Sequence, residues 1–261
     1  LPVRQITPAH VLDILNKTFK RGAPTVAAEA KRTMSGVFEH AVATLRADTD
    51  PVWPVRKALP PNKTQHKRAL STEEVGQLLN DFDGHGGNFQ TIKAFQLMWL
   101  TLSRPNESVQ AEWAEFDLEK ALWTIPARRM KARREHIIPL PTQAVELLKA
   151  MHPITGHTKF VFPNRDDRQR PMADAALRQA LKKLGWATKY SPHGTRTTGS
   201  TRLNEMGYRP DAIEAQLAHA EPNSVRRTYN HATYLDERRV MMQDWADKLD
   251  GWKTHARKDA N

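Results

Sequence analysis

Residues 115–140, which read EFDLEKALWTIPARRMKARREHIIPL, decide the fold of this chain. They predict three short strands around Glu115–Leu118, Ala121–Ile125 and His136–Leu140. Glu119 and Lys120 form a tight turn between the first two strands, and a ten-residue basic loop, Pro126–Glu135, joins the second to the third. The stretch therefore predicts a small antiparallel sheet.

Helices are predicted both before and after this sheet along the sequence. Ser71–Glu74 has the spacing of a capping box, which marks a helix start. Phe89–Leu102 reads as a buried helix, and Arg104 with Pro105 opens another short helix. After the sheet the chain reads as helical, apart from Phe160–Phe162. We therefore expect a mostly α fold with a small antiparallel β-sheet, of the α+β class.

Two further helices are predicted near the N-terminus. Thr7 followed by Pro8 indicates a helix that runs to about Lys20, and a second helix starts near Pro24. Apolar residues recur along the second helix at Val26, Ala30, Met34, Val37, Ala41 and Leu45, which predicts one buried face. Because two helices cannot enclose a substantial core, we interpret residues 1–50 as the tail of a larger helical domain.

A proline-rich, basic stretch follows these helices. Asp48–Arg68 contains four prolines and a cluster of basic residues. Proline fixes φ and removes a backbone donor, so we expect an extended linker here. This places the linker at residues 51–68 and a second domain at residues 69–261.

Composition narrows the partners and excludes some chemistry. A net charge of +11 and a pI of about 9.9 favour a polyanionic partner, usually nucleic acid. The chain has no cysteine, which excludes disulfides, thiol catalysis and Cys-ligated zinc and fits a reducing compartment. No apolar run approaches the ~20 residues that a membrane span needs. The chain opens at Leu1 without a secretory signal, and we expect further sequence upstream.

Four places concentrate side chains that could do chemistry. They are Thr101–Glu107, Arg128–Arg134, His193–Arg196, and Leu217–His219 with Tyr229 ten residues further on. Each has a plain structural alternative: Arg104 and Glu107 could form a surface ion pair, and Tyr229 could be a packing residue. The two histidines also raise the question of zinc, but no third ligand stands at a zinc spacing, so no metal is expected.

Taken together, these residues resemble the tyrosine recombinase (phage integrase) family, whose signature is Arg, Lys, His-x-x-Arg, His and a late Tyr. The resemblance spans about Lys67–Leu249. Glu112–Asp117, Ile125–Leu140 and Met241–Trp245 also resemble the phage and genomic-island integrase branch. The resemblance implies a tyrosine recombinase catalytic fold preceded by part of a helical core-binding domain. It implies site-specific recombination that integrates a mobile element, such as a prophage or genomic island, through a 3′-phosphotyrosine and without ATP.

By this resemblance Tyr229 is the nucleophile, and Arg104 and Arg196 bind the non-bridging oxygens of the scissile phosphate. Guanidiniums suit this task because their donor forks match phosphate oxygens and stay charged. One well-placed donor of this kind is worth a factor of roughly 10²–10³ in rate. With the charge supplied by arginine, we expect no cofactor.

Four more residues receive roles from the same resemblance. Lys131 protonates the 5′-oxygen leaving group, and His193 assists proton transfer. His219 donates a hydrogen bond to the phosphate, and Glu107 orients an active-site side chain. Such help is needed because a phenol with a pKa of about 10 attacks poorly and an alkoxide is a worse leaving group still.

Two other tyrosines are rivals for the nucleophile. Tyr234 stands five residues after Tyr229, where a helix would use it for packing, and Tyr208 precedes the second histidine and fits no family position. The sequence also departs from the family pattern beside the arginines. Ser103 stands where glycine or an aliphatic residue is frequent, and Thr197 where histidine is usual.

The resemblance also implies partners. Double-stranded DNA attachment sites, a homo-tetramer on DNA and accessory DNA-bending proteins are expected, in the cytoplasm of a bacterium and not at a membrane. Candidate phosphate contacts are the basic residues Lys67, Arg68, Arg128, Arg129, Arg133 and Arg134. Residues 234–249 predict a helix that docks either on a neighbouring subunit or on its own domain. A resolvase, a topoisomerase-like nicking–closing enzyme and a catalytically silent DNA-binding protein stay open as alternatives.

Overall fold

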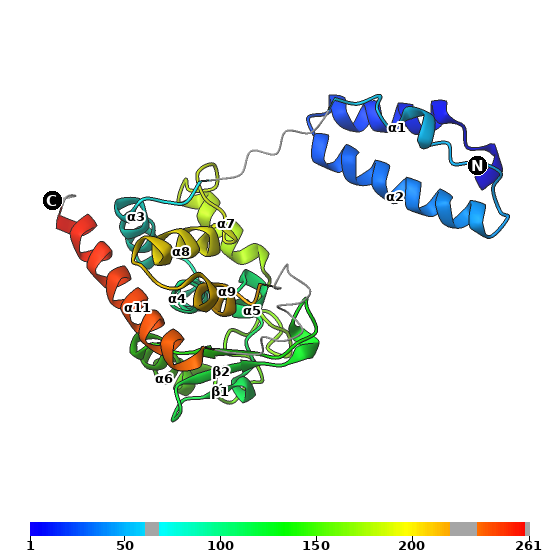
Figure 1. The fold of residues 1–261 in the computed structure, drawn as a ribbon. Helices are drawn as coiled ribbons and strands as arrows, with labels where there is room; N and C mark the ends of the chain where they lie inside the picture. Colours follow the sequence, from blue (N-terminus) through cyan, green and yellow to red (C-terminus); the bar gives the residue numbers. More distant parts are fainter. Residues whose placement is uncertain (61–67, 220–233, 259–261) are drawn as a thin grey trace. The chain divides into compact units, whose positions relative to one another are not determined.

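The structure is a computed structural model that describes residues 1–60, 68–219 and 234–258 (Figure 1). The chain divides into two units, Leu1–His66 and Lys67–Asn261. Tyr229 and Lys67, both singled out above, lie outside the described residues. No helix among the described residues is long and apolar enough to cross a membrane.

The first unit is a helical pair. Its elements are η1 (Val3–Gln5), α1 (Pro8–Lys20), α2 (Pro24–Ala43) and η2 (Trp53–Val55), of which η1 and η2 are single 3₁₀ turns. Both predicted helix starts are confirmed, since each helix has proline at its first position. Val11 and Leu15 of α1 pack with Phe38 and Ala41 of α2 in a small core.

The buried face of α2 agrees in part with the predicted one. Ala41 is buried, and Ala30 and Met34 pack against the small core, as predicted. Val26 and Val37 are instead 51% and 55% exposed, and the buried residues at those turns are Ala27 and Phe38, one position later in each case. Leu45 lies beyond the helix end, in the left-handed region at φ 58°. The helical period allows either of two neighbouring positions to face inward, and the contact with α1 places the larger side chain, Phe38, in the core.

The expected linker is also partly structured. Val52 is buried and packs with the core of the first unit. Its backbone N–H donates to Asp50 Oδ1 at 2.8 Å, and Asp50 Oδ2 accepts from the Ser35 hydroxyl of α2 at 2.9 Å. The prolines of this stretch therefore shape a turn that closes against α2 rather than an extended chain.

The described part of the second unit is mostly helical and contains one sheet of three strands, which confirms the expected fold class. Its helices are α3 (Thr72–Asp83), α4 (Phe89–Thr101), α5 (Pro105–Val109), α6 (Thr142–Thr155), α7 (Ala175–Lys183), α8 (Gly194–Glu205), α9 (Pro210–Gln216) and α11 (Leu235–Lys258). Its strands are β1 (Phe116–Asp117), β2 (Leu122–Ile125) and β3 (His136–Pro139), and 3₁₀ turns lie at η3 (Trp113–Glu115) and η4 (Ala127–Arg129).

The sheet is antiparallel in the order β1-β2-β3. In the register, Trp123 faces Phe116 on one side and Ile138 on the other, and Ile125 faces His136. Side chains alternate along β2, so Trp123 and Ile125 are buried while the residues between them are only partly covered. The predicted strands are therefore confirmed, and the register brings the start of β3 opposite the end of β2, where the basic loop begins and ends.

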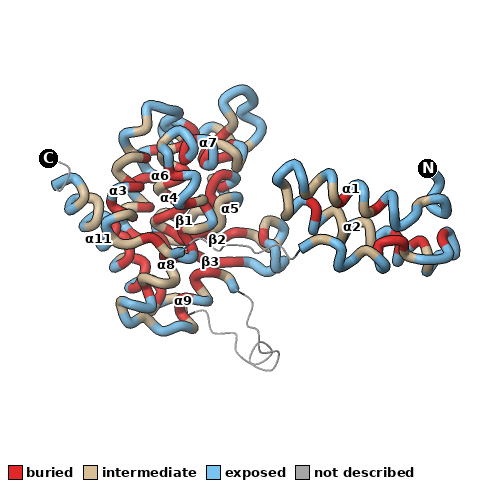
Figure 2. The backbone as a smooth tube through the Cα atoms, turned by 90° about the horizontal axis from the view of Figure 1, so that it is seen from above, coloured by how far each residue is buried: buried red, intermediate tan, exposed pale blue. Residues whose placement is uncertain are grey.

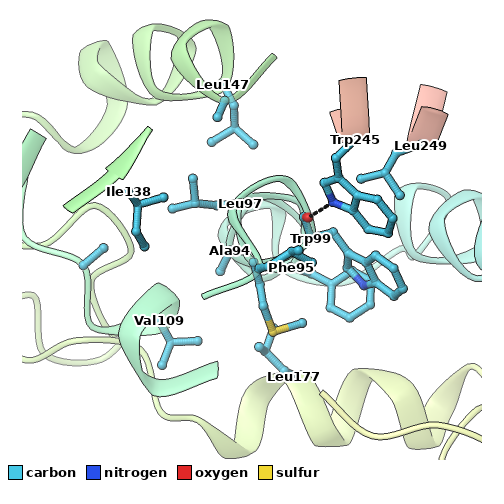
Figure 3. Close-up of a cluster of buried hydrophobic side chains, with 14 of the residues drawn as sticks. Ala94, Phe95, Leu97, Trp99, Val109, Ile138, Leu147, Leu177, Trp245 and Leu249 are labelled. Carbon is cyan, nitrogen blue, oxygen red and sulfur yellow. Dashed lines mark hydrogen bonds between the residues drawn. The ribbon is translucent and has the colours of Figure 1, made fainter. Parts of the chain in front are cut away.

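Helix α4 forms the centre of the second unit, and buried residues gather along it and on the inward faces of the elements around it (Figure 2). Phe95 stacks on Phe82 of α3 with ring centroids 3.7 Å apart. The indole N–H of Trp245 in α11 donates to the Trp99 carbonyl at 2.8 Å (Figure 3). This bond satisfies a polar group inside an otherwise apolar contact.

Helix α11 packs on its own domain, which is one of the two alternatives left open by the sequence. It lies along α3 and also contacts α4, α9 and β3 (Figure 1). Its inward residues are Met241, Met242, Trp245, Ala246 and Leu249, all buried. The approach to α3 is close: a Cβ added at Gly76 would lie 2.2 Å from the Trp252 carbonyl oxygen.

Gly76→Ala should therefore destabilise the second unit by about 1–3 kcal/mol, because backbone atoms of α11 must move to accept one methyl group. Alanine normally stabilises a helix relative to glycine, so the sign is diagnostic. Gly251→Ala is the matched control, since nothing lies within 4 Å of that position in α11. Urea unfolding followed by tryptophan fluorescence measures both variants, and equal stabilities would contradict the close approach.

Candidate active site

The site is built on the turn that ends α9. Three successive backbone carbonyls there accept hydrogen bonds from three cationic or imidazole side chains of distant segments. His136 Nε2 contacts the Gln216 carbonyl at 3.1 Å, Arg196 Nη2 donates to the Leu217 carbonyl, and Arg104 Nη2 donates to the Ala218 carbonyl at 3.2 Å. Ala218 lies in the left-handed region at φ 47°, so the chain turns sharply immediately before His219. The structure therefore brings Arg104, Arg196 and His219 to one place.

Arg196 is buried in α8. Its Nη1 donates to the Leu102 carbonyl at 2.8 Å, and Leu102 is itself left-handed at φ 53°. Burial lowers the pKa of Arg196 to about 10, and the positive charge of Arg104 lowers it further while Glu107 and Glu214 oppose that effect. The guanidinium stays charged at neutral pH.

Arg104 occupies the N-cap position of α5 and is only partly buried. Its Nη1 donates to Glu107 Oε1 at 2.7 Å, and its backbone N–H donates to Glu107 Oε2 at 2.8 Å. Because Glu107 is buried, this pair is not the surface ion pair of the plain alternative. The serine before the arginine also has a place: Ser103 Oγ bonds with Thr101 Oγ1 at 2.9 Å and Ser108 Oγ at 2.5 Å.

The two candidate histidines lie beside these arginines. His193 is the N-cap residue of α8 and is exposed to solvent. Partial burial of the His193 ring lowers its pKa. The charges of the neighbouring candidates Arg196, Arg104, His219 and Lys131 lower it further. His219 is also exposed, with Nδ1 at 2.7 Å from Glu214 Oε2, which leaves Nε2 free of this contact. Four of the candidate residues therefore lie close enough to influence one imidazole.

The basic loop between β2 and β3 divides into two parts. Lys131, Arg133 and Arg134 are exposed. Arg129 is not: its side chain is 11% exposed, it pairs with the buried carboxylate of Glu115, and its Nη2 donates to the Glu107 carbonyl at 2.8 Å. Two donors of Arg129 are thus engaged inside the protein and its charge is paired with Glu115, so it is not an exposed cation of this loop, and its contact with DNA phosphate stays a prediction.

Arg128 and Arg68 keep exposed guanidiniums, although each has an acidic neighbour. Arg128 lies 3.3 Å from Glu112 with 67% of its side chain exposed. Arg68 forms two bonds with Glu74 at 2.6 and 2.5 Å. Pairs of this kind in solvent are weak, so a phosphate can replace them.

The described tyrosines are engaged elsewhere. The Tyr208 hydroxyl donates to Asp244 Oδ2 at 2.8 Å, and burial and then Asp244 raise its pKa to about 12. The Tyr190 hydroxyl is fully buried against Thr195, and burial raises its pKa. Tyr234 packs on the core beneath the guanidinium of Arg209, which lies 5.0 Å from its ring centroid.

Three buried polar residues were missed by the sequence reading: His136, Gln216 and Arg238. Burial lowers the pKa of His136 to about 3, followed by the positive charge of Arg238, so its ring is neutral at physiological pH. Gln216 and Arg238 bond directly, Nε to Oε1 at 2.9 Å. Nothing in the local sequence marks them, since a polar residue on an amphipathic helix is normally assigned to the solvent face. Within the described ranges, no three His, Asp or Glu side chains gather as a metal site would require.

Arg129→Ala should cost about 3–5 kcal/mol of stability, because it removes the cation that pairs with the buried carboxylate of Glu115 and leaves that charge only the Trp123 indole N–H. The neighbouring Arg128→Ala should cost under about 1 kcal/mol, as an exposed pair does. Lys159 also lies 3.3 Å from the carboxylate that Arg128 contacts, so that group keeps a cation. Chemical denaturation of both variants tests the assignment, and a cost for Arg129→Ala as small as that for Arg128→Ala would contradict it.

His136 should make stability fall with acid. The pKa of His136 is depressed in the folded state. Between pH 7 and pH 5 this imidazole therefore becomes protonated in the unfolded chain but stays neutral in the folded chain. Wild type should lose roughly 2 kcal/mol more than His136→Gln over this range, given an unfolded pKa of about 6.5. Glutamine keeps a donor for the Gln216 carbonyl without titrating. Urea titrations at the two pH values measure the difference, and parallel losses would contradict a neutral buried ring.

Comparison with known proteins agrees with this geometry. Residues 68–235 match the Phage integrase family, and residues 1–58 match the Phage integrase central domain. Prophage integrase IntZ of Escherichia coli (strain K12) is 39% identical over 246 residues, which cover 94% of this chain and 60% of that protein. The integrase of Enterobacteria phage P4 is 36% identical over 264 residues, with 95% and 60% covered. The chain thus spans about 60% of the length of these curated relatives.

Solved integrases share the fold. A lambda integrase(75–356) dimer bound to a COC′ core site aligns with a TM-score of 0.63 at 18% identity, covering 84% of this chain and 81% of that chain. The Tn1549 transposon integrase in complex with a circular intermediate DNA aligns at 0.62 with 16% identity, covering 93% and 86%. The expected tyrosine recombinase fold is therefore confirmed. With its arginines, histidines and small sheet in this arrangement, and with the family match across most of its second unit, the chain belongs to the phage integrase family.

Proposed function

We propose that this protein is a site-specific tyrosine recombinase that integrates a mobile element by cutting and rejoining DNA. The observation that carries the proposal is the pair of guanidiniums, Arg104 and Arg196, held by successive carbonyls of one turn. A guanidinium has five N–H donors, and the bonds described above use two on each arginine. Donors therefore remain on both for the non-bridging oxygens of one phosphodiester.

Strand cleavage follows from this arrangement. The Tyr229 oxygen attacks phosphorus, the bond from phosphorus to the 5′-oxygen breaks, and the products are a 3′-phosphotyrosine and a free 5′-hydroxyl. Negative charge grows on the phosphate oxygens in the transition state, where fixed cations in a partly desolvated pocket stabilise it most. Rejoining is the reverse attack by a 5′-hydroxyl, so the energy of the bond is conserved and ATP is not needed.

Two protons must move during cleavage. His193 suits the first step, because its lowered pKa keeps the imidazole neutral at pH 7 and able to accept the phenolic proton. Lys131 suits the second, since a flexible ammonium on the exposed loop can deliver a proton to the departing 5′-oxygen. His219 adds a donor to the phosphate, and Glu107 holds Arg104 in place.

The assignment of Tyr229 is supported by elimination among the described residues. Tyr190, Tyr208 and Tyr234 are each committed to hydrogen bonds or packing that a nucleophile would have to abandon. A raised pKa on Tyr208 opposes formation of the phenolate.

DNA contact is proposed for exposed basic residues around the site. Arg68, Arg128, Arg133 and Arg134, together with Lys67, would position the duplex through its phosphates. The first unit would act as part of the core-binding domain, and the second as the catalytic domain. Lambda integrase has been solved as a tetramer bound to a Holliday junction, and we propose a tetramer on paired sites for this chain as well.

Tyr229→Phe should abolish covalent adducts while DNA binding is kept, because phenylalanine removes only the attacking oxygen. The probe is a random-sequence duplex library with a nick beside the randomised core, so that the cleaved 5′-hydroxyl fragment diffuses away and the adduct accumulates. SDS-resistant DNA–protein adducts and mass mapping of the modified peptide are the readouts.

Tyr208→Phe is the matched control and should form adducts at the wild-type level. Covalent adducts formed by the Tyr229→Phe variant would contradict the assignment of Tyr229 as the nucleophile. Supercoiled plasmids with and without paired copies of the selected duplex then separate the alternatives: joining that depends on paired sites indicates an integrase, and site-independent relaxation indicates a topoisomerase-like enzyme.

A further inference from the structure

A buried polar node joins four elements behind the candidate site. Gln216, the last residue of α9, is fully buried; its Nε2 donates to the Thr101 carbonyl at 2.8 Å and its Oε1 accepts from Arg238 Nε at 2.9 Å. Arg238 is 2% exposed, and its Nη2 donates to the Ile137 carbonyl of β3 at 2.6 Å. One amide and one guanidinium thus connect the ends of α4 and α9 with β3 and the first turn of α11.

The position of this bond along the chain gives it a particular consequence. Gln216 precedes His219 by three residues, and Arg238 follows Tyr229 by nine. The Gln216–Arg238 bond therefore joins the two flanks of the stretch that contains the proposed nucleophile, across 22 positions of sequence.

The same node is continuous with the phosphate-binding arginines. The two carbonyls that follow Gln216 accept from Arg196 and Arg104. Thr101, which accepts from the Gln216 amide, lies three residues before Arg104. A displacement of Gln216 would therefore move the flank of the nucleophile stretch relative to the pocket that holds the phosphate.

Stability alone does not account for an arginine at position 238. Burying a guanidinium costs several kcal/mol in desolvation, and an apolar side chain of similar volume in such a place is often neutral or stabilising. The Arg238 guanidinium instead donates one hydrogen bond to a side-chain oxygen of α9 and another to a backbone oxygen of β3. No apolar residue and no single ammonium group can make both bonds in this geometry.

We propose that Arg238 is a positioning residue for strand cleavage, which acts through Gln216 to align the stretch that carries the nucleophile with the Arg104–Arg196 pocket. The inference rests on the proposed function, in which Tyr229 attacks the bound phosphate. It assigns to Arg238 no contact with the DNA.

The first experiment compares cleavage with binding. The probe is the nicked duplex selected from the random library, and the variants are Arg238→Met, Arg238→Lys and the control Arg239→Ala. Arg239 is the adjacent, partly exposed residue and donates to the Lys120 carbonyl at 3.0 Å. Single-turnover cleavage should fall roughly 10- to 100-fold for Arg238→Met, as expected when reacting groups are misplaced by about 1 Å. The Kd of the intact duplex, from fluorescence anisotropy, should stay unchanged.

Arg238→Lys should cleave at an intermediate rate, because it keeps the charge but reaches only one acceptor, and Arg239→Ala should match wild type. Thermal unfolding is recorded for each variant. If Arg238→Met does not fold, Arg238→Lys carries the test, and wild-type cleavage by a folded Arg238→Lys would overturn the proposal.

The second experiment separates delivery of the nucleophile from activation of the phosphate. In a Tyr229→Phe background, hydrogen peroxide is supplied as an external nucleophile: a peroxide oxygen bonds to phosphorus, the bond to the 5′-oxygen breaks, and that oxygen takes a proton. Adding Arg238→Met should leave this cleavage unchanged, since the arginine pocket is intact and the tyrosine is bypassed.

Loss of peroxide cleavage in the double variant would overturn the proposal, because Arg238 would then maintain the pocket itself. Unchanged tyrosine cleavage in a folded Arg238→Met variant would overturn it as well. Failure of the proposed function looks different: wild type would form no adducts, or Tyr229→Phe would still form them, whatever residue occupies position 238.

Discussion

The site depends on three consecutive carbonyls, those of Gln216, Leu217 and Ala218, which accept hydrogen bonds from His136, Arg196 and Arg104. A helix end leaves such carbonyls without intrahelical partners, so they are available to side chains from elsewhere. Here the donors come from β3, α8 and the start of α5. One turn therefore orients the two arginines that we propose bind phosphate, and it leads directly to His219.

Concentrated positive charge is the cost of this arrangement, and the protein manages it in two ways. Glu107 and Glu214 lie close enough to raise the pKa of Arg196 against the effects of burial and of Arg104. Both His136 and His193 have lowered pKa values, which keeps two further rings from adding charge at neutral pH. Among the described residues, Arg196 stays cationic although burial lowers its pKa, and Arg104 and the exposed Lys131 add further positive charge. A bound phosphodiester would supply negative charge to balance these cations.

The core supports the site by fixing α11. Trp245 reaches the Trp99 carbonyl, and Gly76 allows the backbone of α11 to approach α3 closely. These contacts determine where Arg238 enters the interior, and so they reach the site through Gln216. The close-packed interior transmits position because it has little room to deform. The C-terminal helix is for this reason an integral part of the second unit.

The sequence by itself determined most of the elements and, through a family resemblance, the expected reaction class. Caps, prolines and apolar periods are local signals, and they correctly predicted α1, α3, α4, α5 and all three strands. The order of Arg104, His193, Arg196 and His219 carried the resemblance to the phage integrase family. Tertiary structure decided which cations are free. Arg128 and Arg129 are adjacent and alike in sequence, yet only contact with Glu115, fourteen residues away, takes Arg129 out of solvent. The burial of Phe38 in place of Val37 on α2 and the burial of Gln216 and Arg238 were likewise settled by contacts between distant segments. A side chain's partners depend on which surfaces meet and not on its neighbours along the chain.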